Sequence, residues 1–343
     1  MLCIGEKIKK ALTEANVAGA TVAITDIDKI RAVFPFGRRV IEDASKPTAD
    51  ATLYRAASIT KVVTGVLTMR LVEEGKLDLD IPVKKYLDWF LLKDRNASDR
   101  ITLRHLMSHR SGLPAEYTPE GPLDEGELVP SLIAGLPSLD LAYPVGEGYL
   151  YSNWGIRLVS AVIESVMGER YSSLASRMIL DPLGMRDSGF FLRPGVEYDL
   201  SMPHSRDASG APVSDSYIKE NYCRLATGGL YSNAPDLLKL IRMLMRGGVA
   251  DSGERIISSE SVREMRRENS RLASGDGYGL TLQIHRYDGI ECFGHYGSAP
   301  PYSSALYADP ESGFAAVALI NTDKKDLRRD LVELAIREAR NLK

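Results

Sequence analysis

The order of helix-like and strand-like segments predicts an α+β fold built on one antiparallel sheet. Strand-like segments lie near both ends of the 343-residue chain, while helix-like segments fill its middle and also stand at each terminus. Because strands and helices occur in separate runs, we expect the outer segments to form the sheet, flanked by the terminal helices, and the middle to form an inserted, mostly helical domain. The expected division is residues 1–55 plus 225–343 for the sheet domain and 56–224 for the helical domain, with the candidate functional site at their junction.

Apolar periodicity supports this order. Helical spacing of apolar residues is expected of residues 2–15, 59–72, 101–109, 154–167, 171–179, 234–246 and 325–342. Two-residue alternation or short apolar runs predict strands at residues 20–26, 29–36, 278–285, 290–297, 302–308 and 314–320. Asp288-Gly289 predicts a tight hairpin turn. Residues 115–148, rich in Pro, Gly and acidic residues, are expected to be long connecting loops.

Composition is that of an ordinary globular protein. Apolar residues make up 44% and charged residues 26% of the chain, and the net charge of -3 argues against a nucleic-acid partner, which would need a basic surface. The Arg-rich stretch 263–271 alternates with glutamates and predicts a solvated helix face. Three scattered cysteines, with no apolar leader and no 18-residue apolar run, favour a cytoplasmic protein without a membrane partner.

The first chemical motif is Ser58-Ile59-Thr60-Lys61. On a helix, residues i and i+3 share one face, so Lys61 is expected beside Ser58. A serine hydroxyl is a poor nucleophile until a base takes its proton, and a helix N-terminus supplies N–H groups for an anionic intermediate. The pattern is not specific on its own, because Ser216-Tyr217-Ile218-Lys219 repeats it, although that copy lies in a polar stretch with no helical period behind it.

Two further segments carry candidate groups. Tyr151-Ser152-Asn153 precedes an expected helix, and a tyrosine near a lysine ammonium can act as a general base. The identical Tyr231-Ser232-Asn233 also precedes a helix, so the pattern alone leaves two candidates. His295-Tyr296-Gly297-Ser298 ends an expected strand, where an edge N–H could serve an oxyanion hole and Gly297 would let the substrate approach closely.

In this order the three motifs resemble the serine β-lactamase and penicillin-binding protein family. The pattern S-x-x-K, Y-x-N, H-x-G is similar to the branch that holds class C β-lactamases, DD-carboxypeptidases, D-aminopeptidases and related esterases, whereas class A enzymes use S-x-x-K, S-D-N and K-T-G. The resemblance covers residues 20–322 and implies a β-lactamase/transpeptidase-like fold. Other segments similar to recurrent family blocks are Ser108–Pro114, Pro144–Asn153, Pro182–Met185 and Gly228–Ser232.

The resemblance implies three catalytic residues. Ser58 attacks the substrate carbonyl, and Lys61 assists the removal of its proton. Tyr151, which falls in the catalytic block, is the general base that later protonates the leaving group. Tyr231 falls in the later Gly-Gly block and is expected to be structural.

The resemblance also implies five substrate-binding residues. Asn153 orients the acyl amide, and the N–H of Ser298 forms the oxyanion hole together with the N–H of the nucleophile. His295 takes the position of the Lys of K-T-G and is expected to hydrogen-bond near the catalytic tyrosine. Tyr296 and Gly297 are expected to border the substrate.

The expected function is a serine hydrolase that cleaves an ester or amide, such as an esterase or a D-amino-acid peptidase or amidase. A β-lactamase or DD-carboxypeptidase is the alternative, but Tyr296 stands where many family members have a small Thr, which removes a hydroxyl and adds bulk. An acyltransferase or a slowly deacylating binding or sensor protein would use the same acyl-enzyme. Residues 115–148 and 190–222 are expected to set the specificity, and the oligomeric state is left open.

No cofactor or metal is expected. His105 and His109 have the i, i+4 spacing of a zinc helix, but no Glu follows the first histidine and no third ligand is evident. Cys292 lies in an expected strand and is interpreted as a buried small hydrophobic residue rather than a nucleophile. The expected partner is therefore only a small ester, amide or peptide substrate.

Overall fold

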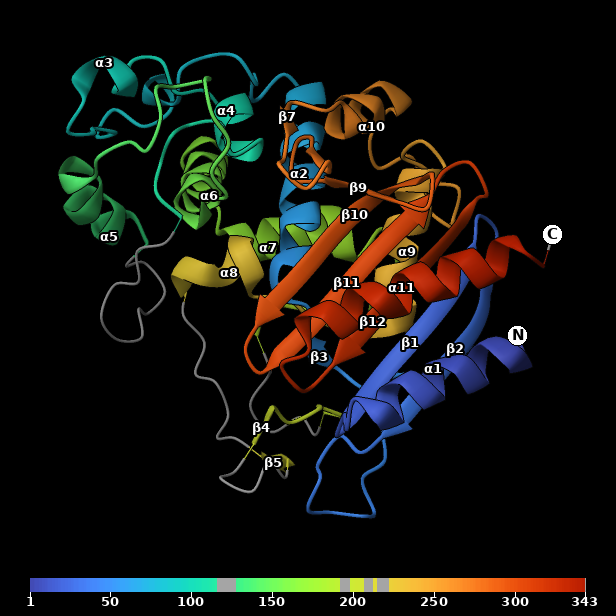
Figure 1. Ribbon diagram of the computed structural model, residues 1–343. Helices are drawn as coiled ribbons and strands as arrows, with labels where there is room; N and C mark the ends of the chain where they lie inside the picture. Colours follow the sequence, from blue (N-terminus) through green and yellow to red (C-terminus); the bar gives the residue numbers. More distant parts are fainter. Residues whose placement is uncertain (116–127, 192–197, 207–211, 215–221, 343) are drawn as a thin grey trace.

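The computed structural model describes residues 1–115, 128–191, 198–206, 212–214 and 222–342 (Figure 1). Its main sheet has eight strands in the order β2-β1-β12-β11-β10-β9-β8-β7, and every neighbouring pair is antiparallel. The strands are β1 (Gly19–Asp26), β2 (Ile30–Gly37), β7 (Ser270–Arg271), β8 (Gly277–Tyr278), β9 (Gln283–Tyr287), β10 (Ile290–Ala299), β11 (Tyr302–Asp309) and β12 (Phe314–Ile320). The two ends of the chain therefore build one sheet, as the sequence predicts.

The helices divide between the two faces of this sheet. They are α1 (Leu2–Glu14), α2 (Thr60–Glu73), α3 (Arg95–Ser98), α4 (Leu103–Met107), α5 (Leu128–Gly135), α6 (Asn153–Met167), α7 (Tyr171–Ala175), α8 (Leu225–Gly228), α9 (Ala234–Met245), α10 (Ser259–Arg266) and α11 (Lys325–Arg340). Figure 1 shows the terminal helices α1 and α11 side by side on one face, while α9 contacts β1, β11 and β12 and α2 contacts β10 from the other side.

The central strands are buried because helices cover both of their faces. Every residue of β1, β11 and β12 is buried, and a strand covered on both sides has no solvent-facing positions to fill with polar residues. The side toward α11 buries that helix's Leu331, Val332 and Ile336. The opposite side joins the large core that holds α2, so the sheet gives α2 a rigid support.

The hairpin between β9 and β10 forms as the sequence predicts. Asp288 and Gly289 have φ values of 47° and 77°. Positive φ at both central positions is the mark of a type I′ turn, whose twist matches that of paired strands. This turn sets the register in which β10 runs toward the candidate site.

The strand expected at residues 278–285 is wrong in one respect, since it is two strands separated by a turn. Gly279 N–H donates to the Leu282 carbonyl at 2.8 Å, and Thr281 has a φ of 58°. Leu280 and Leu282 are both buried, because the turn is tucked into the core rather than extended along a sheet. Alternating leucines fit this buried turn as well as they fit a strand.

The long loop expected at residues 115–148 is also partly wrong, because α5 occupies Leu128–Gly135 and is followed by a 3-10 turn at Leu136–Ser138. Of the loops expected to set specificity, residues 116–127, 192–197, 207–211 and 215–221 lie outside the described residues, as does the second S-x-x-K copy. Across the part of the chain that the structure describes, no helix combines the length and the apolar character needed to cross a membrane.

Candidate active site

Ser58 lies in the short turn that leads into the helix α2. The 3-10 turn η1 (Ala57–Ile59) leads directly into α2. Ala57 has a φ of 49°, a left-handed conformation that costs free energy in a residue with a Cβ and is found at sharply turned functional sites. This turn leaves Ser58 half-buried at the N-terminal end of α2, where the helix dipole favours negative charge.

Lys61 is completely buried beside this serine. Its side chain has 0% exposure, and Nζ lies 3.1 Å from Ser58 Oγ. Nζ also donates a hydrogen bond of 2.7 Å to the Thr227 carbonyl and lies 5.0 Å from the centre of the Tyr151 ring. The structure therefore brings Ser58, Lys61 and Tyr151 together, as the sequence analysis expects of a nucleophile and its proton-transfer partners.

The segment 225–230 holds α2 in place behind the serine. Thr64 Oγ1 donates to the Ala226 carbonyl at 2.7 Å, and the Leu230 N–H donates to Thr60 Oγ1 at 3.2 Å. Together with the bond from Lys61 to the Thr227 carbonyl, these contacts fix one turn of α2 against backbone. The Thr227 carbonyl thus gives the lysine ammonium a backbone acceptor in addition to the Ser58 hydroxyl.

The second Tyr-Ser-Asn segment has a structural role, as the sequence analysis expects. Tyr231 and Ser232 form β6, which pairs with β3 (Tyr54–Arg55), and Asn233 caps α9 by accepting a hydrogen bond of 2.9 Å from the Asp236 N–H. By contrast, Asn153, the first residue of α6, lines the same pocket as Ser58.

His295 is buried close to the candidate site, in the same ring cluster as Tyr151. Its Nε2 pairs with the Tyr278 hydroxyl at 2.9 Å, and its ring centre lies 6.1 Å from that of Tyr151. Burial, followed by the charge of Lys61, lowers the pKa of His295 to about 3, so the imidazole is neutral. The partner of His295 is thus Tyr278, which the sequence analysis did not single out.

Tyr296 does not reach the pocket with its side chain. Successive residues of a strand point to opposite faces, and the Tyr296 ring lies on the α11 face, 4.7 Å from the ring of Tyr307, with the Arg328 guanidinium 5.3 Å above it. The expectation that its bulk borders the substrate is therefore wrong. Position 296 still lacks the hydroxyl that a Thr would place there.

Gly297 lies where β10 passes close to the turn Ala57–Ile59, which holds Ser58 and is called the serine turn. A Cβ on this residue would stand 2.1 Å from Ser304 Oγ and 2.4 Å from the Ala56 carbonyl oxygen, so only glycine fits. Ser304 Oγ donates to that same carbonyl at 2.8 Å, which ties β11 to the start of the serine turn. The following residue, Ser298, is exposed and lines the pocket with Ser58.

Arg328 holds the peptide that joins Gly297 to Ser298. Its Nη1 donates to the Gly297 carbonyl. In a trans peptide the carbonyl and the following N–H point in opposite directions, so a charged donor on the Gly297 carbonyl orients and polarises the N–H of Ser298. That N–H is the predicted second donor of the oxyanion hole.

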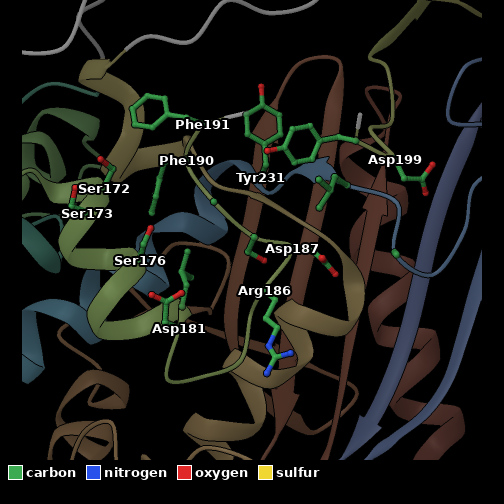
Figure 2. Close-up of a pocket in the computed structure, with 16 residues that line it drawn as sticks. Ser172, Ser173, Ser176, Asp181, Arg186, Asp187, Phe190, Phe191, Asp199 and Tyr231 are labelled. Atoms are coloured by element: carbon green, nitrogen blue, oxygen red, sulfur yellow. The ribbon is translucent and has the colours of Figure 1, made fainter. Parts of the chain in front are cut away.

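The pocket at Ser58 has a volume of about 410 Å³. Its wall comes from the turn that holds Ser58, from α6, from α8 and the residue before it, and from the end of β10. The lining residues are Arg55, Ala57, Ser58, Asn153, Arg157, Arg224, Thr227, Gly228, Ser298, Ala299 and Pro300. A larger hollow of about 730 Å³ is shown in Figure 2, between the end of α7 and Tyr231. None of the predicted catalytic residues lines that hollow, so its size does not mark it as the reaction site.

The metal alternative finds no geometric support in the histidine pair. The helix α4 ends at Met107, and His109 follows it with a φ of 57°, so the two histidines do not share one helix face. His105 Nδ1 contacts Thr102 Oγ1 at 3.1 Å, whereas His109 Nε2 contacts the Tyr278 hydroxyl. Within residues 1–115, 128–191, 198–206, 212–214 and 222–342, no group of three or more His, Cys, Asp or Glu side chains could hold a metal ion.

Cys292 behaves as the small buried residue that the sequence analysis expects. It is 1% exposed, and burial raises the pKa of its thiol to about 12. A thiol with so high a pKa supplies almost no thiolate near neutral pH, so it is not a competing nucleophile.

A sheet flanked by helices, with a serine at the start of a buried helix and a lysine one turn later, defines a serine hydrolase of the β-lactamase/transpeptidase type. A sequence model of the Beta-lactamase family matches residues 4–341. The chain therefore belongs to this family, whose members are serine hydrolases that work through an acyl-enzyme, and the predicted fold class and enzyme class are confirmed.

Named relatives agree with this assignment. Penicillin-binding protein 4 of Amycolatopsis lactamdurans is 26% identical over 92% of this chain and 84% of its own length. Esterase EstB of Burkholderia gladioli is 26% identical over 87% of this chain and 84% of its own length. The octameric penicillin-binding protein homologue from Pyrococcus abyssi superimposes with a TM-score of 0.84 at 27% identity, covering 98% of this chain and 76% of the other.

The sequence analysis missed three groups around the site. Thr227, whose carbonyl accepts a hydrogen bond from Lys61, directly precedes the Gly228–Ser232 block, but the sequence analysis named neither this residue nor its role. His109 lies within the Ser108–Pro114 block and was weighed only as a metal ligand. Tyr278 carried no signal beyond its place in an expected strand, because its contacts come from residues far away along the chain.

Proposed function

We propose that this chain hydrolyses an ester or amide of a small molecule through an acyl-enzyme formed on Ser58. The observation that carries the proposal is Lys61 Nζ, fully buried and 3.1 Å from the serine Oγ, in a pocket large enough for a small acyl group. A buried ammonium that is hydrogen-bonded to a hydroxyl stabilises the negative charge that develops when that hydroxyl loses its proton. Tyr151, whose ring lies above the same ammonium, is the proposed base.

In the acylation step, the bond between Ser58 Oγ and the carbonyl carbon forms while the serine proton passes to Tyr151, which acts as a phenolate beside the Lys61 ammonium. The carbonyl oxygen becomes an oxyanion, which accepts hydrogen bonds from the N–H groups of Ser58 and Ser298. Its collapse breaks the bond to the leaving alcohol or amine, and the proton held by Tyr151 goes to that leaving group. Asn153, at the start of α6 in the same pocket, orients the acyl group.

In the deacylation step, water attacks the acyl-enzyme and gives its proton to the same base. The second oxyanion collapses, Ser58 Oγ takes the proton back, and the carboxylic acid leaves. An alcohol or amine in place of water would make the chain an acyltransferase, and no acceptor at all would make it a slowly deacylating sensor. The esterase and the penicillin-binding protein among its relatives support esters and peptide-like amides as the substrates to examine.

The test is a substrate panel run on wild type and on Ser58→Ala. The panel holds short-chain 4-nitrophenyl esters, D-aminoacyl amides, a D-Ala-D-Ala peptide and a cephalosporin. We expect turnover of esters or D-aminoacyl amides, slower or no turnover of the cephalosporin, and none in the variant. Turnover that survives Ser58→Ala would overturn the proposal, whereas turnover that appears only when an amine is added would indicate a transferase.

We also propose the cytoplasm as the location of this enzyme. The support is that Cys3, Cys223 and Cys292 are all free, which fits a reducing compartment. Fractionation of cells that express the tagged chain would test this, and recovery outside the cytoplasmic fraction would contradict it.

A further inference from the structure

Three buried side chains, His109, Tyr278 and His295, form a hydrogen-bond chain whose direction is fixed at both ends by backbone groups. The Ser152 N–H donates to His109 Nδ1 at 3.1 Å, so the ring proton of neutral His109 is on Nε2. At the other end, His295 Nδ1 contacts the Tyr296 carbonyl oxygen, which can only accept, so the ring proton of His295 is on Nδ1.

These two ends determine the central hydrogen bonds. His109 Nε2–H donates to the Tyr278 oxygen at 3.1 Å. Tyr278 then donates its single hydrogen to His295 Nε2 at 2.9 Å. Both ring nitrogens of each histidine and the phenol are thereby used, with one donor and one acceptor at every link.

The hydrogen-bonded series His109–Tyr278–His295 resists protonation, because a proton added to either ring would point at a group that is itself a hydrogen-bond donor. A proton on His109 Nδ1 would point at the Ser152 N–H, and a proton on His295 Nε2 would point at the Tyr278 hydroxyl hydrogen. All three side chains are at most 1% exposed. A buried donor left without an acceptor is costly, so the neutral state with these tautomers is the stable one.

The neighbouring charged and titratable groups act in the same direction. Lys61 on α2 disfavours a positive charge on either histidine, and Arg328 on α11 disfavours it on His295. Burial raises the pKa of Tyr278 well above its usual value, and Tyr151 and Tyr149, which face it, act in the same direction.

His109 holds the backbone on both sides of Tyr151. The Leu150 N–H donates to the His109 carbonyl at 3.0 Å, and the Ser152 N–H donates to the His109 ring. The rings of His109 and Tyr151 are 4.3 Å apart. His109 therefore contacts the Tyr151 ring directly and accepts hydrogen bonds from the backbone of both neighbouring residues.

We propose that His109 and Tyr278 are positioning residues, which tie the Tyr151 segment to β10 through an uncharged His109–Tyr278–His295 chain of fixed tautomers. The proposal rests on the proposed function, because its effect on catalysis requires Tyr151 to act at Ser58. The chain joins the base to the strand that carries Ser298, the predicted oxyanion donor, and it does so without adding a charge beside Lys61.

The kinetic test is Tyr278→Phe, which removes the central hydroxyl and keeps the ring. Tyr149→Phe is the matched control, because Tyr149 packs 5.7 Å from Tyr278 in the same cluster, and its hydroxyl has no hydrogen-bond partner among the residues described. We expect kcat for a 4-nitrophenyl ester to fall about tenfold to a hundredfold in Tyr278→Phe with KM changed less than about threefold, since small displacements of a reacting group have effects of this size. Tyr149→Phe is expected to stay within about twofold.

The spectroscopic test is read from the wild-type protein, and substitutions serve only to assign its signals. The protein contains five histidines, so ¹⁵N NMR of histidine-labelled wild type, assigned with single substitutions, reads each tautomer. We expect His109 as the Nε2–H form and His295 as the Nδ1–H form, both neutral from pH 8 to pH 5. Titration of either ring near pH 6.5, or the opposite tautomers, would overturn the proposal.

The outcomes separate this proposal from the proposed function. If wild type is not labelled at Ser58 by a fluorophosphonate, the proposed function fails, while the NMR spectra still test the chain. If wild type is labelled and active, but Tyr278→Phe has the kcat of Tyr149→Phe, the positioning role fails alone. Should Tyr278→Phe not fold, the wild-type spectra decide.

Discussion

Gly297→Ala tests whether β10 forms part of the catalytic centre. The added Cβ would meet Ser304 Oγ at 2.1 Å and the Ala56 carbonyl oxygen at 2.4 Å, whereas ordinary contact begins at 3.4 Å. The strand and the serine turn must therefore separate by about 1 Å, and overpacking of this kind costs about 1–3 kcal/mol of unfolding free energy. Because Ser298 follows directly, the same shift moves its N–H away from the position of an oxyanion.

A misplacement of about 1 Å at an oxyanion donor corresponds to a loss of roughly a hundredfold in kcat. We expect kcat for a 4-nitrophenyl ester to fall by about that factor, with the thermal midpoint lowered by a few degrees. Gly189→Ala is the matched control, because a Cβ there has nothing within 4 Å. If Gly297→Ala folds and keeps kcat within about twofold of wild type, the role given to β10 is refuted.

Three further predictions concern single groups. Tyr151→Phe removes the proposed base and is expected to lower kcat for the same ester by a factor of about 10² to 10⁴. An unchanged kcat would exclude Tyr151 as the general base. With a thiol-reactive dye we expect fast reaction at Cys3, which is exposed, and slow reaction at the buried Cys223 and Cys292; three equally fast thiols would contradict this burial. Since the pKa of His295 is lowered to about 3, the unfolded chain binds a proton below pH 6.5 that the folded chain does not. Unfolding free energy should then fall as the pH drops from 6.5 to 5, by up to about 1.4 kcal/mol per pH unit for this group, and urea denaturation of wild type and His295→Asn should differ in that slope.

The sequence predicted most of the fold because its longest elements have strong local signals. The helix α2 has apolar residues at helical spacing and is buried along most of its length, directly after the turn that holds Ser58, and the β9–β10 turn carries Asp288-Gly289, whose backbone preferences are local. The segment 278–285 was predicted incorrectly, because tertiary contacts decided its conformation. Leu280 N–H donates to the Met265 carbonyl and Thr281 N–H to the Met107 carbonyl, both at 2.9 Å, and neither bond can be inferred from the alternation of leucines.

Only part of the candidate site could be predicted, because some of its residues have a local sequence signal and others depend on tertiary contacts. The motifs containing Ser58, Lys61 and Tyr151 could be recognised because chemistry restricts their residue types. Tyr296 was misplaced because the third motif was treated as one surface, although alternation along a strand puts Tyr296 and His295 on opposite faces. Tyr278 could not be found, since its role depends on contact with a histidine 169 positions away.

The most direct test of the central claim is intact-mass analysis of the protein after treatment with a fluorophosphonate, followed by peptide mapping. We predict one adduct per chain, on the peptide that contains Ser58. The adduct should be absent from Ser58→Ala and present in Ser216→Ala, which removes the serine of the second S-x-x-K segment. An adduct that persists in Ser58→Ala, or that disappears in Ser216→Ala, would contradict the assignment of Ser58 as the nucleophile.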